Sequence, residues 1–370
     1  KGAGSTAQTW RNRRKQLASD GFTFEYSATF GQAVAGSSAD VEEDYGKSIL
    51  FDYSYPRFYD DGYGKDYNIL NLETEMQDEL REQYLLANLL TFFEQKYVYN
   101  REPETFHDEY NIRNPLLVFI GHTVNAGKTQ SALSNNDEKS LADVEEVLLF
   151  LSQVLQNEDD WVPDTIETLL SGGSGLERED GDDLFADEFV ALREAGLSGD
   201  DIYQRILANV FQTESAADLS VVNITNAQGE IGLRATTTDK YFGVINIGND
   251  QVFLDRVCEH DAIRVEKDEF SDSLFRAINS HDSDISVLLG SRKFIEGWDS
   301  WRVSTMGLMN FGRGEGPQVI QLFGRGVRLL GKNQTLKRSQ ELSGSHPEHI
   351  EALETLNIFG VRADYIAAFR

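Results

Sequence analysis

The chain has 370 residues, of which 40% are hydrophobic and 26% are charged, and its formal net charge at pH 7 is −28. These values are typical of a soluble globular protein with one large or two ordinary cores. No run of eighteen apolar residues is present, so we predict no transmembrane helix. The single Cys258 excludes an intramolecular disulfide and a thiolate zinc cluster, and we therefore expect a cytoplasmic protein without a metal site.

Charge is distributed unevenly along the chain. Residues 130–200 carry nineteen acids and three bases, a balance of −16, whereas residues 292–338 carry nine bases and three acids, a balance of +6. The net charge argues against nucleic-acid binding, because phosphates attract positive surface, but the second segment supplies such surface locally. Arginine outnumbers lysine by twenty-two to twelve. This profile favours a halophilic cytoplasm, where salt screens acidic self-repulsion; an acidic protein from an ordinary cytoplasm is the alternative.

The first third of the chain predicts alternating helices and strands. Residues 6–19 have the pattern of a basic amphipathic helix, and residues 21–26 alternate like a strand that ends in Ser27-Ala28-Thr29. We expect a strand at 47–55 and a loop at 56–65. The apolar spacing over residues 73–98 predicts a long helix.

A continuous apolar run at residues 116–120 predicts a buried parallel strand, and Gly121-His122-Thr123 follows directly after it. Gly127-Lys128-Thr129, a little further on, invites an alternative interpretation as a phosphate-binding loop. That loop needs a glycine five residues before Gly127, where His122 stands. The pattern therefore disfavours a phosphate-binding loop at this position.

The middle of the chain predicts an insertion and then a return to strands. Residues 140–156, 184–195 and 200–211 have helical periodicity, so residues 130–211 are interpreted as a helical insertion. Residues 220–224 and 230–235 predict a β-hairpin. The remaining elements expected before residue 280 are a strand at 241–247 and helices at 251–257 and 270–278.

The stretch around which the chain is organised runs from residue 286 to residue 328. Apolar runs at 285–290 and 303–309 predict two buried strands. In a following helix, Gln321, Arg325 and Arg328 would share one face, because they lie four and three residues apart. Two guanidiniums on one face suit a tetrahedral polyanion; a surface ion-pair face is the structural alternative. We expect two short helices, split at Gly360, over residues 348–370.

Three short segments in this order resemble motifs of superfamily-two DEAD/DEAH-box helicases. Ser27-Ala28-Thr29 resembles motif III, Glu296-Gly297-Trp298-Asp299 resembles motif V, and the series Gln321, Gly324, Arg325, Arg328 resembles motif VI. The amino-acid sequence of these segments is most similar to that of the restriction (Res) subunit of type III restriction enzymes and related defence helicases. Residues 229–234 and 241–248 carry a second part of that resemblance.

The resemblance implies an α/β fold with a RecA-like parallel sheet flanked by helices. Residues 1–45 would be the tail of the first lobe and residues 46–345 the second lobe, with a following helical region from residue 346. Walker A and the DEAH box would lie upstream of this chain and an endonuclease domain beyond Arg370. The chain alone is then expected not to hydrolyse ATP.

The resemblance also implies roles for single residues. Arg328 would be the arginine finger, Arg325 its partner on the phosphates, and Gln321 would hold the helix in register. The motif III residues would couple the two lobes. The residues that would approach ATP are Glu296, Gly297, Asp299 and Gly324. The residues that would contact DNA are Gly121, His122, Thr123 and Lys293. Asp299 would contact either the ribose or a motif VI arginine.

The implied cofactors are ATP and Mg²⁺, with the magnesium ligands upstream. The implied partners are DNA, the first lobe and a methyltransferase or other defence subunit. The implied function is an ATP-dependent DNA helicase or translocase of a restriction or phage-defence system. A nucleic-acid-binding or scaffolding fragment without catalysis is the alternative.

We predict that salt stabilises this protein. Like charges at the density of residues 130–200 repel one another, and salt shortens the range of that repulsion from about 10 Å at 0.1 M to about 3 Å at 1 M. The melting temperature should therefore rise between low and molar potassium chloride. A melting temperature that stays level or falls over this range would remove the halophile hypothesis.

Overall fold

The computed structural model describes residues 5–27, 43, 45–70, 78–121, 135–177, 181–247, 250–291, 298–309 and 316–361. Its helices are α1 (Ser5–Leu17), α4 (Tyr55–Asp60), α5 (Asp78–Arg101), α6 (Asn135–Gln156), α7 (Trp161–Leu170), α8 (Val190–Ala195), α9 (Gly199–Asn209), α10 (Asp250–Val257), α11 (Leu274–Ala277), α12 (Gly316–Gly326) and α13 (Ile350–Leu353). Its strands are β1 (Asp66–Ile69), β2 (Leu116–Gly121), β3 (Leu219–Ile224), β4 (Glu230–Ala235), β5 (Gly243–Asn246), β6 (Ile263–Asp268), β7 (Val287–Ser291), β8 (Val303–Met309) and β9 (Thr355–Val361).

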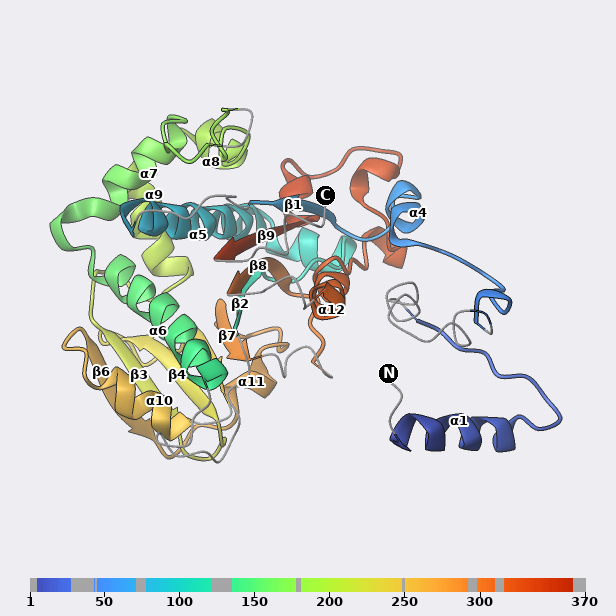
Figure 1. Ribbon diagram of the computed structural model, residues 1–370. Helices are drawn as coiled ribbons and strands as arrows, with labels where there is room; N and C mark the ends of the chain where they lie inside the picture. Colours follow the sequence, from blue (N-terminus) through green and yellow to red (C-terminus); the bar gives the residue numbers. More distant parts are fainter. Residues whose placement is uncertain are drawn as a thin grey trace.

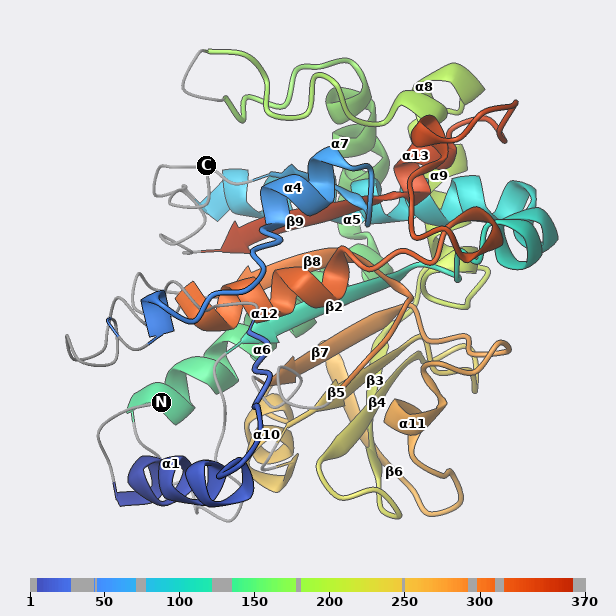
Figure 2. The same ribbon diagram turned by 90° about the vertical axis from the view of Figure 1, so that its right-hand side faces the viewer.

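The nine strands form one sheet in the order β1-β9-β8-β2-β7-β5-β4-β3-β6. Every neighbouring pair from β1 to β5 is parallel. β4 is antiparallel to both β3 and β5, while β6 is parallel to β3, so β4 alone among these strands runs the other way. Figure 2 shows the strands stacked from β9 to β6. The predicted α/β class, the mostly parallel sheet and the hairpin at 220–235 are confirmed.

The central strand β2 shows why this sheet needs helices on both sides. All six of its residues are buried. Leu117 and Phe119 belong to one hydrophobic core, whereas Leu116, Val118 and Ile120 belong to another. Successive side chains of a strand point to opposite faces, so an unbroken apolar run requires cover on each face.

Two sets of helices provide that cover. Residues of α5, α6, α7, α9 and α10 share the core of Leu117 and Phe119, whereas α11 and α12 contribute to the core of Val118. Figure 1 shows α6 and α12 on opposite sides of β2 and β7. The helices predicted over residues 130–211 are thus packed into the main core. Among the described residues, no helix combines the length and apolar character that crossing a bilayer requires.

The strand predicted at 47–55 is wrong. Residues 49–54 are irregular, and α4 begins at Tyr55, the last residue of the predicted strand, and continues to Asp60 in the segment expected to be a loop. Pro56 stands in the first turn of this helix, where its missing N–H costs nothing and its fixed φ favours the helical conformation. The strand of this region is β1, which follows the helix and pairs with β9.

The two short helices predicted at the carboxyl end are also wrong in part. Of the predicted range, the structure describes residues 348–361, and within these α13 is the one helix, while Gly360 lies inside the buried strand β9, which pairs with β8 and β1. The segment from Thr355 is too short for its periodicity to separate helix from strand. Strand β6 was missed because three of its six residues are exposed and it includes Arg264, Glu266 and Lys267, a composition typical of a sheet edge.

The amino-terminal segment lies apart from the sheet. Helix α1 matches its prediction closely, and Arg14 contacts Glu25 and Tyr45 within the same segment. The strand predicted at residues 21–26 is wrong, because residues 21–27 have no regular secondary structure, and Phe22 and Tyr26 are each 94% exposed. Figure 1 shows α1 separated from the layered body.

We predict that Gly307→Ala destabilises the protein. Gly307 lies in β8, where an added Cβ would stand 2.5 Å from Phe119 Cδ1 and 2.8 Å from Phe359 Cζ, both atoms of rigid rings. Overpacking of this kind costs about 1–3 kcal/mol. Denaturant unfolding measures the change. Gly324→Ala is the matched control, since nothing lies within 4 Å of its Cβ position and alanine favours a helix; equal stability of the two variants would contradict the packing argument.

Candidate functional site

Helix α12 carries the motif VI-like residues across the sheet. Its Leu322 and Phe323 are buried in the core of Val118, and an added Cβ on Gly326 would stand 2.7 Å from Leu356 Cδ2. Its end is fixed near the start of β8, because Lys65 N–H donates to Val327 O at 2.8 Å and Lys65 Nζ donates to Val303 O at 2.6 Å. The arginines therefore lie at the amino edge of the parallel strands.

The two arginines meet the motif V-like segment at this edge. Arg325 donates to the carbonyl oxygen of Trp298, and Arg328 forms an ion pair with the carboxylate of Asp299. The Arg328 and Asp299 side chains are 38% and 57% exposed. Of the two contacts considered for Asp299, the structure thus contains the one with an arginine. Residues that are 27 and 29 positions apart in the sequence are thus in contact, at a place that solvent can reach.

Arg328 does not lie on the helix, contrary to the sequence analysis. Helix α12 ends at Gly326, and Arg328 follows two residues later. The pair nevertheless stays together, and the pKa of Arg325 is lowered, first by burial and then by the charge of Arg328. Two neighbouring cations that repel each other favour an anion placed between them.

The other predicted residues that the structure describes lie in several places. Gln321 and Gly324 are exposed on α12. Gly121 is buried at the end of β2, on the carboxyl edge of the sheet and thus at the opposite edge from Arg325. Ser27 is exposed in the extended segment after α1. The predicted residues that lie outside the described part are Ala28, Thr29, His122, Thr123, Lys293, Glu296 and Gly297, together with Gly127-Lys128-Thr129.

Three buried cations at the same edge were not anticipated from the sequence. Arg302 donates to the carbonyl oxygens of Asn114 at 2.8 Å and Ile285 at 2.6 Å, and also to that of Ile278. Lys96 donates to Asn114 Oδ1 at 3.1 Å and Ser286 Oγ at 3.0 Å. Together with Lys65, these side chains connect the starts of β2, β7 and β8 to the loops around them.

Burial disfavours the charge on each of these groups. Loss of water lowers the pKa of Lys65 to about 8, that of Lys96 to about 7 and that of Arg302 to about 10. For Lys96 the charge of Arg302 is the second cause. The sequence offers one signal for such residues, since Arg302 and Lys65 each stand just before a strand.

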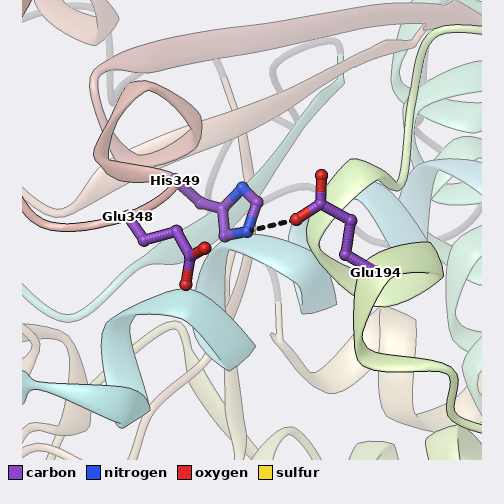
Figure 3. Close-up of side chains that lie close together, drawn as sticks. All are labelled: Glu194, Glu348 and His349. Atoms are coloured by element: carbon purple, nitrogen blue, oxygen red, sulfur yellow. Dashed lines mark ion pairs between the residues drawn. The ribbon is translucent and has the colours of Figure 1, made fainter.

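A separate cluster of two carboxylates and one histidine has the residue types of a metal site. One ligand atom from each of Glu194, Glu348 and His349 lies within 4.8 Å of the others, and Figure 3 shows the three side chains converging from α8 and from the segment before α13. His349 Nε2 lies 3.2 Å from Glu194, while Glu348 pairs with Arg101 at 2.9 Å. The carboxylates thus already have cationic or imidazole partners, and the cluster connects two short helices.

Comparisons of the chain with protein-family models, with curated proteins and with solved structures find no match. What the site can do chemically follows from its own groups. Arg325 and Arg328 offer several N–H donors in planar forks, one anchored on a carbonyl and one on an exposed carboxylate. Such a pair suits a phosphate group that arrives from outside.

We predict that stability increases with pH above neutrality. Between the lowered pKa of Lys65 and Lys96 and the ordinary value near 10.5, the unfolded chain holds protons that the folded chain lacks, so the free energy of unfolding rises with pH. Each group contributes a slope of up to about 1.4 kcal/mol per pH unit. Urea unfolding between pH 7.5 and 9.5 measures the slope. Lys96→Met should reduce it, and Lys267→Met, which removes an exposed lysine, should not; equal slopes in all three proteins would contradict the assignment.

Proposed function

We propose that this chain is the second RecA-like lobe of an ATP-dependent DNA helicase or translocase, similar to the restriction subunit of type III restriction enzymes. The observation that carries the proposal is the contact of Arg325 and Arg328 with Trp298 and Asp299. These are the residues that the resemblance assigns to motifs VI and V. Their association supports one nucleotide-responsive unit.

The ion pair of Arg328 is exposed to solvent, which suits the role of an arginine finger. Ion pairs exposed to this degree contribute about 0–1 kcal/mol, so a phosphate with more negative charge can displace Asp299 at small cost. Arg325, which donates to the carbonyl oxygen of Trp298, lies beside Arg328 and adds a second positive charge next to the same ligand. When the first lobe brings ATP and its Mg²⁺ against this edge, Arg328 stabilises charge that develops on the transferred phosphoryl group.

The remaining assignments follow from the same proposal. Gly121, with His122, Thr123 and Lys293, would contribute to the DNA track, and Ser27-Ala28-Thr29 would transmit the nucleotide state between lobes. The enzyme would act in the cytoplasm within a restriction or phage-defence system. Its partners would be DNA, the first lobe and a methyltransferase or another defence subunit.

We predict that Arg328→Ala, made in the intact parent enzyme, abolishes ATP turnover and leaves ATP binding and folding nearly unchanged. A finger reaches the γ-phosphate in the closed state, so it acts on the transition state more than on the bound ground state. Loss of such a group lowers the rate by about 10³–10⁵-fold. Turnover under saturating DNA measures the effect, with nucleotide binding measured in parallel.

Two further variants sharpen this experiment. Arg328→Lys should rescue poorly, since lysine offers a point charge in place of a planar fork. Arg264→Ala, which removes an exposed arginine of the edge strand β6, should keep parental turnover. Parental turnover by Arg328→Ala would show that the Arg328–Asp299 contact is only a surface ion pair.

A further inference from the structure

A pocket of about 490 Å³ opens at the amino edge of the sheet, next to the arginine pair. Its lining includes His107, Arg113, His281, Asp299, Trp301 and Arg302. The first three come from segments that the motif-like stretches do not include: the π-helical turn Thr105–Glu109, the residues before β2 and the loop before β7. Its volume falls in the range of about 300–1,000 Å³ that is usual for small-molecule sites.

Two histidine rings meet in this pocket, and one of them, His107, is held by polar contacts on both ring nitrogens. The rings of His107 and His281 lie edge to face with their centroids 4.6 Å apart. His107 Nδ1 lies 2.6 Å from Asp108, and its Nε2 contacts the guanidinium of Arg113. Because arginine can only donate, that His107 nitrogen accepts, and the ring carries its proton on Nδ1. His107 therefore positions the Arg113 fork in the pocket wall.

In the described part of the chain, the two cations behind this wall, Arg302 and Lys96, form no ion pair with a carboxylate, and Asp284 acts on Lys96 only through its charge. Among the described residues, Arg302 and Lys96 bond to carbonyl oxygens and neutral side chains, and Arg302 is only 4% exposed. Of the lining residues, Asp299 is the one carboxylate, and Arg328 already pairs with it. Buried cations without counter-ions are costly, and an anion in the adjoining pocket would reduce that cost.

We propose that this pocket binds the terminal phosphate of a nucleotide, at a site separate from the Arg325–Arg328 pair. Arg113 supplies a planar fork that matches a phosphate, with Arg302 and Lys96 behind it. Trp301 is 36% exposed in the same wall and offers an indole face on which a base stacks. The phosphate can belong to a free nucleotide or to the 5′ end of a DNA strand.

The test uses the 370-residue chain and AMP, with adenosine as the probe that lacks phosphate. Titration calorimetry should show AMP binding and no comparable adenosine binding. Arg113→Gln should weaken AMP binding by roughly tenfold or more, since hydrogen bonds to charged groups contribute about that much. Arg264→Gln removes an exposed arginine from the far edge strand and should bind AMP as the parent does.

Arg328→Ala separates this proposal from the proposed function. AMP binding that persists in Arg328→Ala and is lost in Arg113→Gln supports the pocket, whatever the fate of the helicase assignment. Three outcomes would overturn it. The first is AMP binding that is lost in Arg328→Ala and persists in Arg113→Gln. The others are equal binding of adenosine and AMP, and no AMP binding by the parent chain. A 5′-phosphorylated single strand that binds more tightly than AMP identifies a DNA end as the source; weaker binding than AMP identifies a free nucleotide. A 5′-hydroxyl strand that binds as tightly as its phosphorylated counterpart would also contradict the proposal.

Discussion

The parallel pairing of β2 with β7 and β8 is the constraint on which the candidate site depends. Leu117 pairs in register with Val287 on one side and Thr305 on the other, so three strands from distant parts of the chain start at one edge. The segment between β7 and β8 must then return to that edge, which brings Trp298 and Asp299 there. Helix α12 returns over the same strands, which brings Arg325 there as well.

That edge accumulates cations for a physical reason. Helices that follow parallel strands run back against them, so their carboxyl ends and unpaired carbonyls gather where the strands begin. Arg302 satisfies one such carbonyl, that of Ile278 at the end of α11. Lys65 donates to the Val303 carbonyl at the start of β8, and Lys96 donates to side-chain oxygens next to it, and all three cations stay buried. In a chain with a net charge of −28, this concentrates basic side chains at the edge where the arginine pair also lies.

The sequence was sufficient to predict the position of an element where that element is long or its apolar pattern is unbroken. β2, β8 and the 220–235 hairpin were placed almost to the residue, because their apolar periodicity leaves one solution. β6 and β9 were missed, since an exposed edge strand and a short strand after a helical turn depend on partners distant in sequence. The sequence analysis singled out the two arginines of the candidate site, but it did not single out the pocket histidines. His107 and His281 are 174 positions apart, and only the fold brings their rings together.

Burial decides which arginine at this edge can act on a ligand. Arg302 directs its donors to three backbone carbonyls and is 4% exposed, so its guanidinium cannot turn without leaving those carbonyls unpaired. Among the described residues, Arg328 pairs with the exposed carboxylate of Asp299, and the Arg328 side chain is itself 38% exposed. Moving Arg328 from Asp299 to a phosphate exchanges one charged partner for another and leaves no buried group unsatisfied. The same residue type therefore holds the sheet edge together in one place and remains available to an incoming anion in the other.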